Sequence, residues 1–197
     1  MHRIPFIFGV LILHLLVAGC ADGQTVRPIA QDEAMLLQEF QKFDAANKVK
    51  LTEDGEPGER LLLCITLVDK QTKKALGGQK IQFFHTDTTG EYSPRVAGDE
   101  STARLSGTTV ADAEGRVFVE TTMPGAYGSS ASNRHIHTTI FGARPEGYDI
   151  NFRQYSSFMG RRFSNSSDQH FMADLKRGTD GSLVVFITME AKFRRLD

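Results

Sequence analysis

The feature that most constrains the fold is a series of short hydrophobic segments separated by glycine-containing turns. Leu61–Val68 is a continuous apolar run, Arg116–Thr121 alternates between apolar and polar residues, and Leu183–Met189 is again largely apolar. Turns such as Gly77-Gly78 and Asp112–Gly115 separate these segments, and no long helical pattern interrupts them. Short strands with frequent turns are typical of β-sandwiches. We therefore expect residues 58–197 to form an all-β domain, an antiparallel β-sandwich.

The N-terminus has the pattern of an export signal. Arg3 precedes an apolar stretch, Ile4–Ala18, that is too short to span a bilayer comfortably. The segment Leu16–Cys20 resembles the lipobox of bacterial lipoproteins, in which cleavage leaves the cysteine as a lipidated N-terminus. We expect residues 1–19 to be a lipoprotein signal peptide, and Cys20 to hold the exported protein on a membrane, in the periplasm or at the cell surface. An ordinary signal peptide with an incidental cysteine is the alternative.

Residues 20–57 are expected to form a tether followed by a short helical arm. The apolar spacing within Glu33–Phe40 fits an amphipathic helix. The turn cluster Asp54–Gly58 then separates this arm from the main domain.

Charge and cysteine content exclude two further features. The formal net charge is −1 and no block of basic residues is present, so nucleic acid is not an expected partner. With Cys20 lipidated, Cys64 is the other cysteine of the chain and has no partner for an intrachain disulfide. Because it lies within the apolar Leu61–Ile65, we expect it to be buried and inert.

Two histidines and two tyrosines are the candidate metal ligands. In a strand, alternate side chains share a face, so His135 and His137 can point together while Ile136 faces the core. Tyr92 and Tyr127 both follow glycine-containing turns. Imidazole suits iron, zinc, copper and nickel, whereas phenol, with a pKa of about 10, loses its proton most readily to a strongly charged ion. Taken singly, each of these residues is more often structural; taken together, they favour a ferric iron site.

The order and spacing of these residues resemble the intradiol ring-cleavage dioxygenases, which include catechol and protocatechuate dioxygenases. The resemblance extends from about Leu61 to Met189. Its motifs are Gly77–Tyr92, which ends in Gly-Glu-Tyr, then Ala111–Arg116, Thr121–Tyr127 and His135-Ile136-His137.

The resemblance implies a non-haem Fe(III) site held by Tyr92, Tyr127, His135 and His137. It further implies that a catechol-type substrate displaces Tyr127, whose freed phenolate accepts a substrate proton. The iron acts largely as a Lewis acid, and O2 opens the ring between the two hydroxyl-bearing carbons to give a muconate-type diacid.

Four other positions bear on the resemblance. The family's arginine three residues before the first ligand histidine is replaced here by Ser132. Arg134 is the nearest substitute, although in a strand it would share a face with Ile136, away from the ligands. Arg153-Gln154-Tyr155 resembles the family's glutamine-containing segment, which makes Gln154 a candidate for hydrogen bonding near the iron or oxygen site. His85 lies in an apolar strand and is expected to be structural.

Two alternatives of another class stay open. A non-catalytic β-sandwich binding or structural module could retain the fold without the chemistry, and the replacement at Ser132 favours it. A zinc hydrolase using His135 and His137 is weaker, because no matching carboxylate or cysteine is evident as a third ligand.

Overall fold

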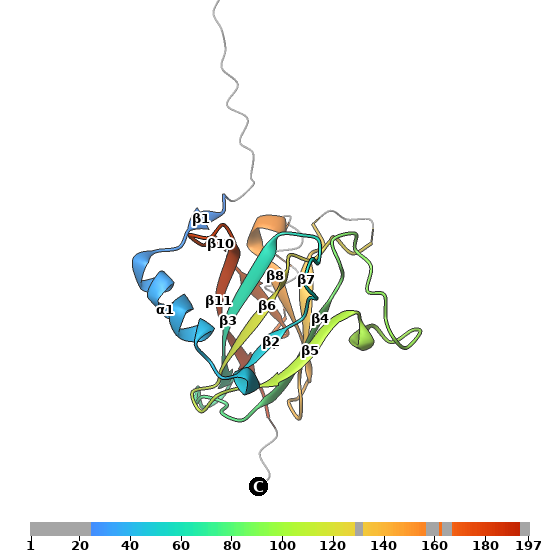
Figure 1. The fold of residues 1–197 in the computed structure, drawn as a ribbon. Coiled ribbons are helices and arrows are strands. Elements are labelled where there is room, and N and C mark those ends of the chain that lie inside the picture. The colour runs from blue at the N-terminus through green and yellow to red at the C-terminus, as the bar shows by residue number, and fades with distance from the viewer. Residues whose placement is uncertain (1–24, 129–131, 157–161, 163–166, 194–197) are drawn as a thin grey trace, which may run out of the picture.

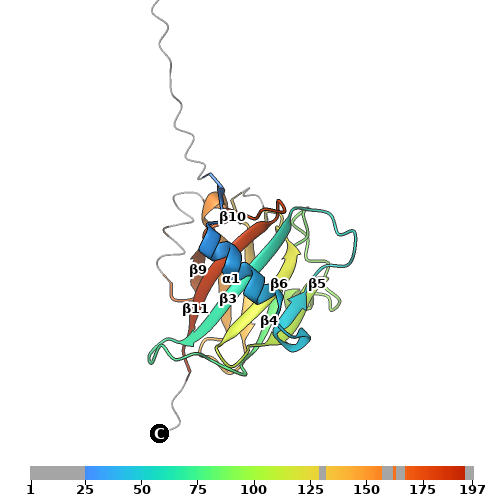
Figure 2. The same ribbon diagram turned by 60° about the vertical axis from the view of Figure 1, so that its left-hand side comes forward.

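Two β-sheets packed face to face, with the helix Gln31–Gln41 on the outside, make up the architecture of the described part of the computed structural model (Figures 1 and 2). The structure describes residues 25–128, 132–156, 162 and 167–193; the expected signal peptide and Cys20 lie outside these ranges. The strands are β1 Arg27–Pro28, β2 Lys48–Lys50, β3 Arg60–Asp69, β4 Lys80–His85, β5 Leu105–Val110, β6 Arg116–Thr122, β7 His135–Ile140, β8 Gly147–Phe152, β9 His170–Ala173, β10 Lys176–Arg177 and β11 Leu183–Ala191. The helices are α1 Gln31–Gln41 and the short 3-10 turns η1 Ala45–Asn47, η2 Glu100–Thr102 and η3 Arg153–Tyr155.

Both sheets mix parallel and antiparallel pairs, so the expectation of a purely antiparallel sandwich is wrong in that respect. The first sheet has the order β1-β10-β11-β3-β6-β2, in which β3 pairs with β11 in parallel and with β6 antiparallel. The second has the order β5-β4-β7-β8-β9, in which only the β8–β9 pair is parallel. Parallel partners need a crossover between remote segments, and a strand's own alternation does not encode the direction of such a partner.

The first sheet is buried on both faces, which explains the continuous apolar run in β3. Leu61, Leu63 and Ile65 face the second sheet and are fully buried. The alternate residues Leu62 and Cys64 face α1. Burial raises the pKa of the Cys64 thiol to about 12, so this cysteine is a core residue that stays protonated, as expected.

The helix α1 confirms the expected helical arm and lies on the outer face of the first sheet (Figure 2). Leu37 and Phe40 pack onto this face. At the helix start, the Ala30 N–H donates to the Glu33 carboxylate (2.9 Å), and the same carboxylate forms an ion pair with Lys176 of β10. The segment before Gly58 therefore contributes two strands to the first sheet and the helix that covers it. The expected boundary near residue 57 between this arm and the main domain stays a prediction.

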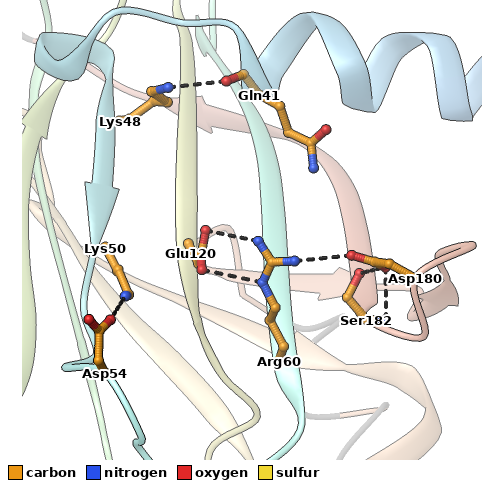
Figure 3. A network of polar contacts seen from close by, with 8 residues as sticks. All are labelled: Gln41, Lys48, Lys50, Asp54, Arg60, Glu120, Asp180 and Ser182. Carbon is orange, nitrogen blue, oxygen red and sulfur yellow. Dashed lines mark hydrogen bonds and ion pairs between the residues drawn. The ribbon is translucent and has the colours of Figure 1, made fainter.

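A polar network continues the outer face of the first sheet beyond the helix (Figure 3). Arg60 shares this face with Leu62 and Cys64. Its guanidinium donates to both carboxylate oxygens of Glu120 (3.1 and 3.3 Å) and to Asp180 (3.0 Å). It thereby links β3, β6 and the turn before β11 where the helix gives no cover.

Within the described residues, no helix is both long and apolar enough to cross a membrane.

Candidate metal centre

The candidate ligands His135 and His137 lie on the outer face of the second sheet, in strand β7. Ile136 between them is fully buried in the core, as strand alternation predicts. Phe84, opposite His137 in β4, stacks on its imidazole with ring centroids 4.8 Å apart. The two histidine rings meet edge to face at 4.4 Å. The strand therefore presents two adjacent imidazoles, one of them held from the side by an aromatic ring.

Two glycines bring the turns that carry Tyr92 and Tyr127 into backbone contact. A Cβ atom at Gly90 would lie 2.3 Å from the Ala126 carbonyl oxygen, and one at Gly125 would lie 2.5 Å from the Asp87 carbonyl oxygen. Real Cβ atoms do not approach backbone so closely, so both positions require glycine. The Gly125 N–H donates to the same Asp87 carbonyl (2.8 Å). As a result, the rings of Tyr92 and Tyr127 lie 5.4 Å apart.

Three atoms that could bind a metal ion converge at the centre of this arrangement. The Tyr92 hydroxyl lies 2.8 Å from Nε2 of His137, and Nε2 of His135 lies 3.0 Å from the same nitrogen. One phenol oxygen and two imidazole nitrogens thus face one another from two different parts of the chain. Such a set can bind one ion when the phenol loses its proton.

The surroundings control which of these groups carry protons. Burial, together with the nearby His137, lowers the pKa of His135 to about 4, so its imidazole is neutral at pH 7 and keeps a free electron pair. Burial also raises the pKa of Tyr92, and the carboxylate of Glu100 adds to this effect. Without a cation the Tyr92 phenol therefore keeps its proton.

Strand β8 adds Asp149, a residue that the sequence analysis did not single out. Its Oδ1 lies 2.7 Å from Nδ1 of His137. Burial alone would raise the pKa of this carboxyl, but the hydrogen bond from His137 and the neighbouring imidazoles lower it. His135, His137 and Asp149 form a possible metal site, with one ligand atom from each lying within 4.8 Å of the others.

Asn151, the next residue on this face of β8, was also missed. It pairs with His135 in the β7–β8 register, and its buried Nδ2 has no hydrogen-bond partner among the described residues. A signal was present in the sequence, because Tyr148–Phe152 alternates apolar and polar residues as the histidine strand does. Two adjacent strands with this alternation place their polar side chains on one face.

Two further predicted site residues, Tyr127 and Arg134, form contacts outside the group of Tyr92, His135 and His137. Tyr127 is 42% exposed, and its hydroxyl donates to Glu100 at 3.4 Å. The Arg134 guanidinium donates to the Pro124 carbonyl (3.1 Å) and lies 4.6 Å from the ring centre of Tyr155.

The hydrogen bonds of the Gln154 side chain go to Leu175 and not to the tyrosines or histidines. Its side-chain amide forms two hydrogen bonds with the backbone of Leu175, at 3.0 and 3.2 Å. His85, by contrast, is where its apolar strand predicts. It is fully buried, with its ring nitrogens 2.6 Å from the Thr86 carbonyl and the Thr121 hydroxyl, and burial lowers its pKa to about 4.

Two surface hollows adjoin the candidate ligands. One has a volume of about 540 Å³, and Tyr92, Tyr127 and Glu100 are among the residues that line it. The other has a volume of about 280 Å³ and is lined by His137 and Asp149 among others. A larger hollow of about 750 Å³ lies between α1, β1 and β10, where Gln154 and Lys176 contribute to its wall. Of these hollows, the one of about 540 Å³ is lined by both tyrosines, so it is the candidate substrate site.

The chain is similar to known dioxygenases in sequence and in fold. A family model described as a dioxygenase matches residues 38–191. No curated protein sequence matches the chain. With this match and the structural relatives below, the chain belongs to the intradiol ring-cleavage dioxygenase family.

Solved structures of related fold come from bacteria and from an animal. The dioxygenase domain of a dioxygenase–carbohydrate-binding fusion from Streptomyces sp. SirexAA-E is 19% identical, with a TM-score of 0.55 over 77% of this chain and 93% of that one. An intradiol ring-cleavage dioxygenase from Tetranychus urticae is 23% identical, with a TM-score of 0.53 over 76% and 89%. The catechol 1,2-dioxygenase of Pseudomonas arvilla C-1 is 20% identical, with a TM-score of 0.55 over 76% of this chain but 57% of that enzyme. At these identities the likeness shows the fold.

The family uses non-haem iron, and the donor set present here fits that ion. Imidazole nitrogen suits iron as well as zinc and copper, whereas a phenolate oxygen is a hard ligand that favours a highly charged cation. The neutral state of His135 leaves its electron pair free to bind. Tyr92, His135 and His137 are therefore the residues that converge to hold iron. Tyr127, the fourth predicted ligand, has its ring 5.4 Å from that of Tyr92 and its hydroxyl on Glu100, so it would have to turn from Glu100 to bind the same ion.

Proposed function

We propose that the protein is a non-haem Fe(III)-dependent intradiol dioxygenase that cleaves a catechol-type ring with O2 to a muconate-type diacid. The convergence of the Tyr92 oxygen and the two Nε2 atoms of His135 and His137, in a chain of this family, carries the proposal. Bound there, ferric iron would act as a Lewis acid that withdraws electrons from the chelated catecholate. Both atoms of O2 enter the product as the bond between the two hydroxyl-bearing carbons breaks.

The two tyrosines take different parts in this proposal. Tyr92 is 6% exposed and would be a permanent ligand, whereas Tyr127 is 42% exposed and borders the hollow. Tyr127 is therefore the ligand that an incoming catechol would displace. Its freed phenolate oxygen would take the proton of one catechol hydroxyl. The Glu100 carboxylate also lines the hollow, 3.4 Å from the Tyr127 hydroxyl oxygen, and is the next group that would accept this proton.

A visible spectrum tests the proposal. The purified protein is loaded with ferric iron, and its spectrum is recorded before and after catechol is added without oxygen. We expect a broad tyrosinate-to-iron band that shifts with catechol, and a muconate once oxygen is admitted. A colourless protein that binds no iron would contradict the proposal. It would favour instead a non-catalytic binding module, an alternative supported by the contacts that hold Arg134 on Pro124 and Tyr155.

We also propose that the protein is an exported bacterial lipoprotein, held on a membrane by acyl chains on Cys20. The support is the sequence of residues 1–20, which lie outside the described residues. Mass spectrometry of the mature N-terminus from the membrane fraction tests this. A chain that starts at an acylated Cys20 agrees with the proposal, and an uncleaved or unmodified N-terminus contradicts it.

A further inference from the structure

Asp149 lies behind His137, on the opposite side of the imidazole from Tyr92. The β7–β8 register places the two residues directly opposite each other, and Asp149 Oδ1 is 2.7 Å from Nδ1 of His137. The other nitrogen, Nε2, faces the Tyr92 hydroxyl and His135. The carboxylate and the phenol therefore approach the two different nitrogens of one ring.

This contact decides which nitrogen of His137 carries the proton. An ionised carboxylate only accepts hydrogen bonds, so the proton of the neutral ring must be on Nδ1. Nε2 then has its electron pair free, in the direction of Tyr92 and His135. In the opposite tautomer a proton would occupy the place where the ion has to bind.

The second oxygen of Asp149 faces a histidine across the sheet. Asp149 pairs with His170 in the β8–β9 register, and its Oδ2 lies 3.4 Å from Nδ1 of His170. Phe84 stacks on the ring of His137 from the neighbouring strand β4. The row Phe84, His137, Asp149 and His170 thus runs across four strands. Within it, the Phe84 ring holds the plane of the His137 imidazole and the Asp149 carboxylate selects its tautomer.

Asp149 could in principle be a ligand itself, because its oxygen is close to both histidines. An ion bound between this carboxylate and Nδ1 of His137 would lie on the far side of the ring from Tyr92. It would give up the phenol and the hollow of about 540 Å³, and would border the hollow of about 280 Å³ that Asp149 and His170 line. The two arrangements exclude each other, and only one of them uses the tyrosine.

We propose that Asp149 is a positioning residue of the metal centre: it accepts the Nδ1 proton of His137, directs Nε2 toward the ion and does not bind the ion itself. The proposal rests on the metal site of the proposed function. Carboxylates behind ligand histidines orient the ring in many metal sites, and their loss commonly lowers metal affinity 10–100-fold.

The first test needs no metal, so it stands even if the proposed function fails. Nitrogen-15 NMR of the histidine side chains in the metal-free protein reports the tautomer of each ring. We expect His137 to be protonated on Nδ1 in the wild type, and to populate the Nε2-protonated form in Asp149→Ala. A wild-type His137 protonated on Nε2, or a tautomer unaffected by the substitution, would overturn the proposal.

The second test measures Fe(III) affinity by competition with a chelator, monitored by visible absorbance. Asp149→Ala is expected to weaken binding about 10–100-fold while the tyrosinate band keeps its position, because Tyr92 is untouched. Loss of the band together with an unchanged His137 tautomer would make Asp149 a ligand and overturn the proposal. If Asp149→Ala does not fold, the isosteric Asp149→Asn is used, with weakened iron binding again expected and an unchanged affinity overturning the proposal.

Asp174→Asn is the matched control. Asp174, between β9 and β10, is more exposed than Asp149 and accepts a hydrogen bond from Arg153 at 2.8 Å. We expect it to change neither the His137 tautomer nor the iron affinity. An equal loss of affinity in this variant would assign the effect to general charge and contradict a positioning role.

Discussion

Tyr92 differs from the other buried tyrosine, Tyr148, in what its hydroxyl meets. The Tyr92 hydroxyl lies 2.8 Å from His137, whereas that of Tyr148 accepts a hydrogen bond from the Lys192 N–H at 3.4 Å. Because even partners behind a ligand are worth 10–100-fold in affinity, Tyr92→Phe should weaken Fe(III) binding by more than about 100-fold. It should also remove most of the visible band. Iron titration of Tyr92→Phe and of the control Tyr148→Phe measures this.

Tyr148→Phe is the control, since it removes a hydroxyl from an equally buried ring. It should bind iron with wild-type affinity and colour. Equal behaviour of the two variants would mean that Tyr92 is a core residue rather than a ligand.

For single residues, the sequence predicts which side chains share a face within one strand. It does not predict where a side chain points once the strand has ended. Period-two alternation places His135 and His137 together because both lie in β7. Gln154 follows β8 only two residues after Phe152, but it lies in η3, where a 3-10 turn redirects the side chain to the backbone of Leu175. The polar residue that β8 does place opposite His135 is Asn151.

Among the elements, the contact between two turns is what aligns the tyrosines. Gly125→Ala would place a Cβ atom 2.5 Å from the Asp87 carbonyl oxygen, and backbone cannot move aside easily. We expect it to lower the free energy of unfolding by about 1–3 kcal/mol and to weaken iron binding. Urea unfolding and iron titration measure the two effects.

Gly147→Ala is the comparison for this prediction. A Cβ atom at Gly147 meets nothing within 4 Å, so alanine should leave stability unchanged or raise it by up to about 1 kcal/mol. Its iron affinity should equal that of the wild type. Losses of the same size in both variants would show that the close approach at Gly125 is not needed.

The strands themselves were largely predictable, whereas their partners were not. Leu61–Val68 and Leu183–Met189 were expected as strands and form parts of β3 and β11. Their parallel pairing joins segments more than a hundred residues apart. Such a pairing depends on how the whole chain crosses between sheets, which no local pattern contains.

In the whole molecule, the candidate metal centre and the helix lie on opposite outer faces. The helix covers one face of the first sheet through Leu37 and Phe40, while the histidines project from the far face of the second sheet. A loss of packing under the helix should therefore reduce stability without altering the site. Sheet residues such as Leu62 would be left partly exposed.

Phe40→Ala tests this separation. Phe40 is 2% exposed, and the deletion of a buried phenylalanine costs about 3–5 kcal/mol of unfolding free energy. Met35 lies on the same helix but is 55% exposed, so Met35→Ala should cost less than about 0.5 kcal/mol of unfolding free energy. Under conditions in which both variants stay folded, both should bind iron as the wild type does. A fall in iron affinity in folded Phe40→Ala alone would show that packing under the helix is transmitted through both sheets to the histidine strand.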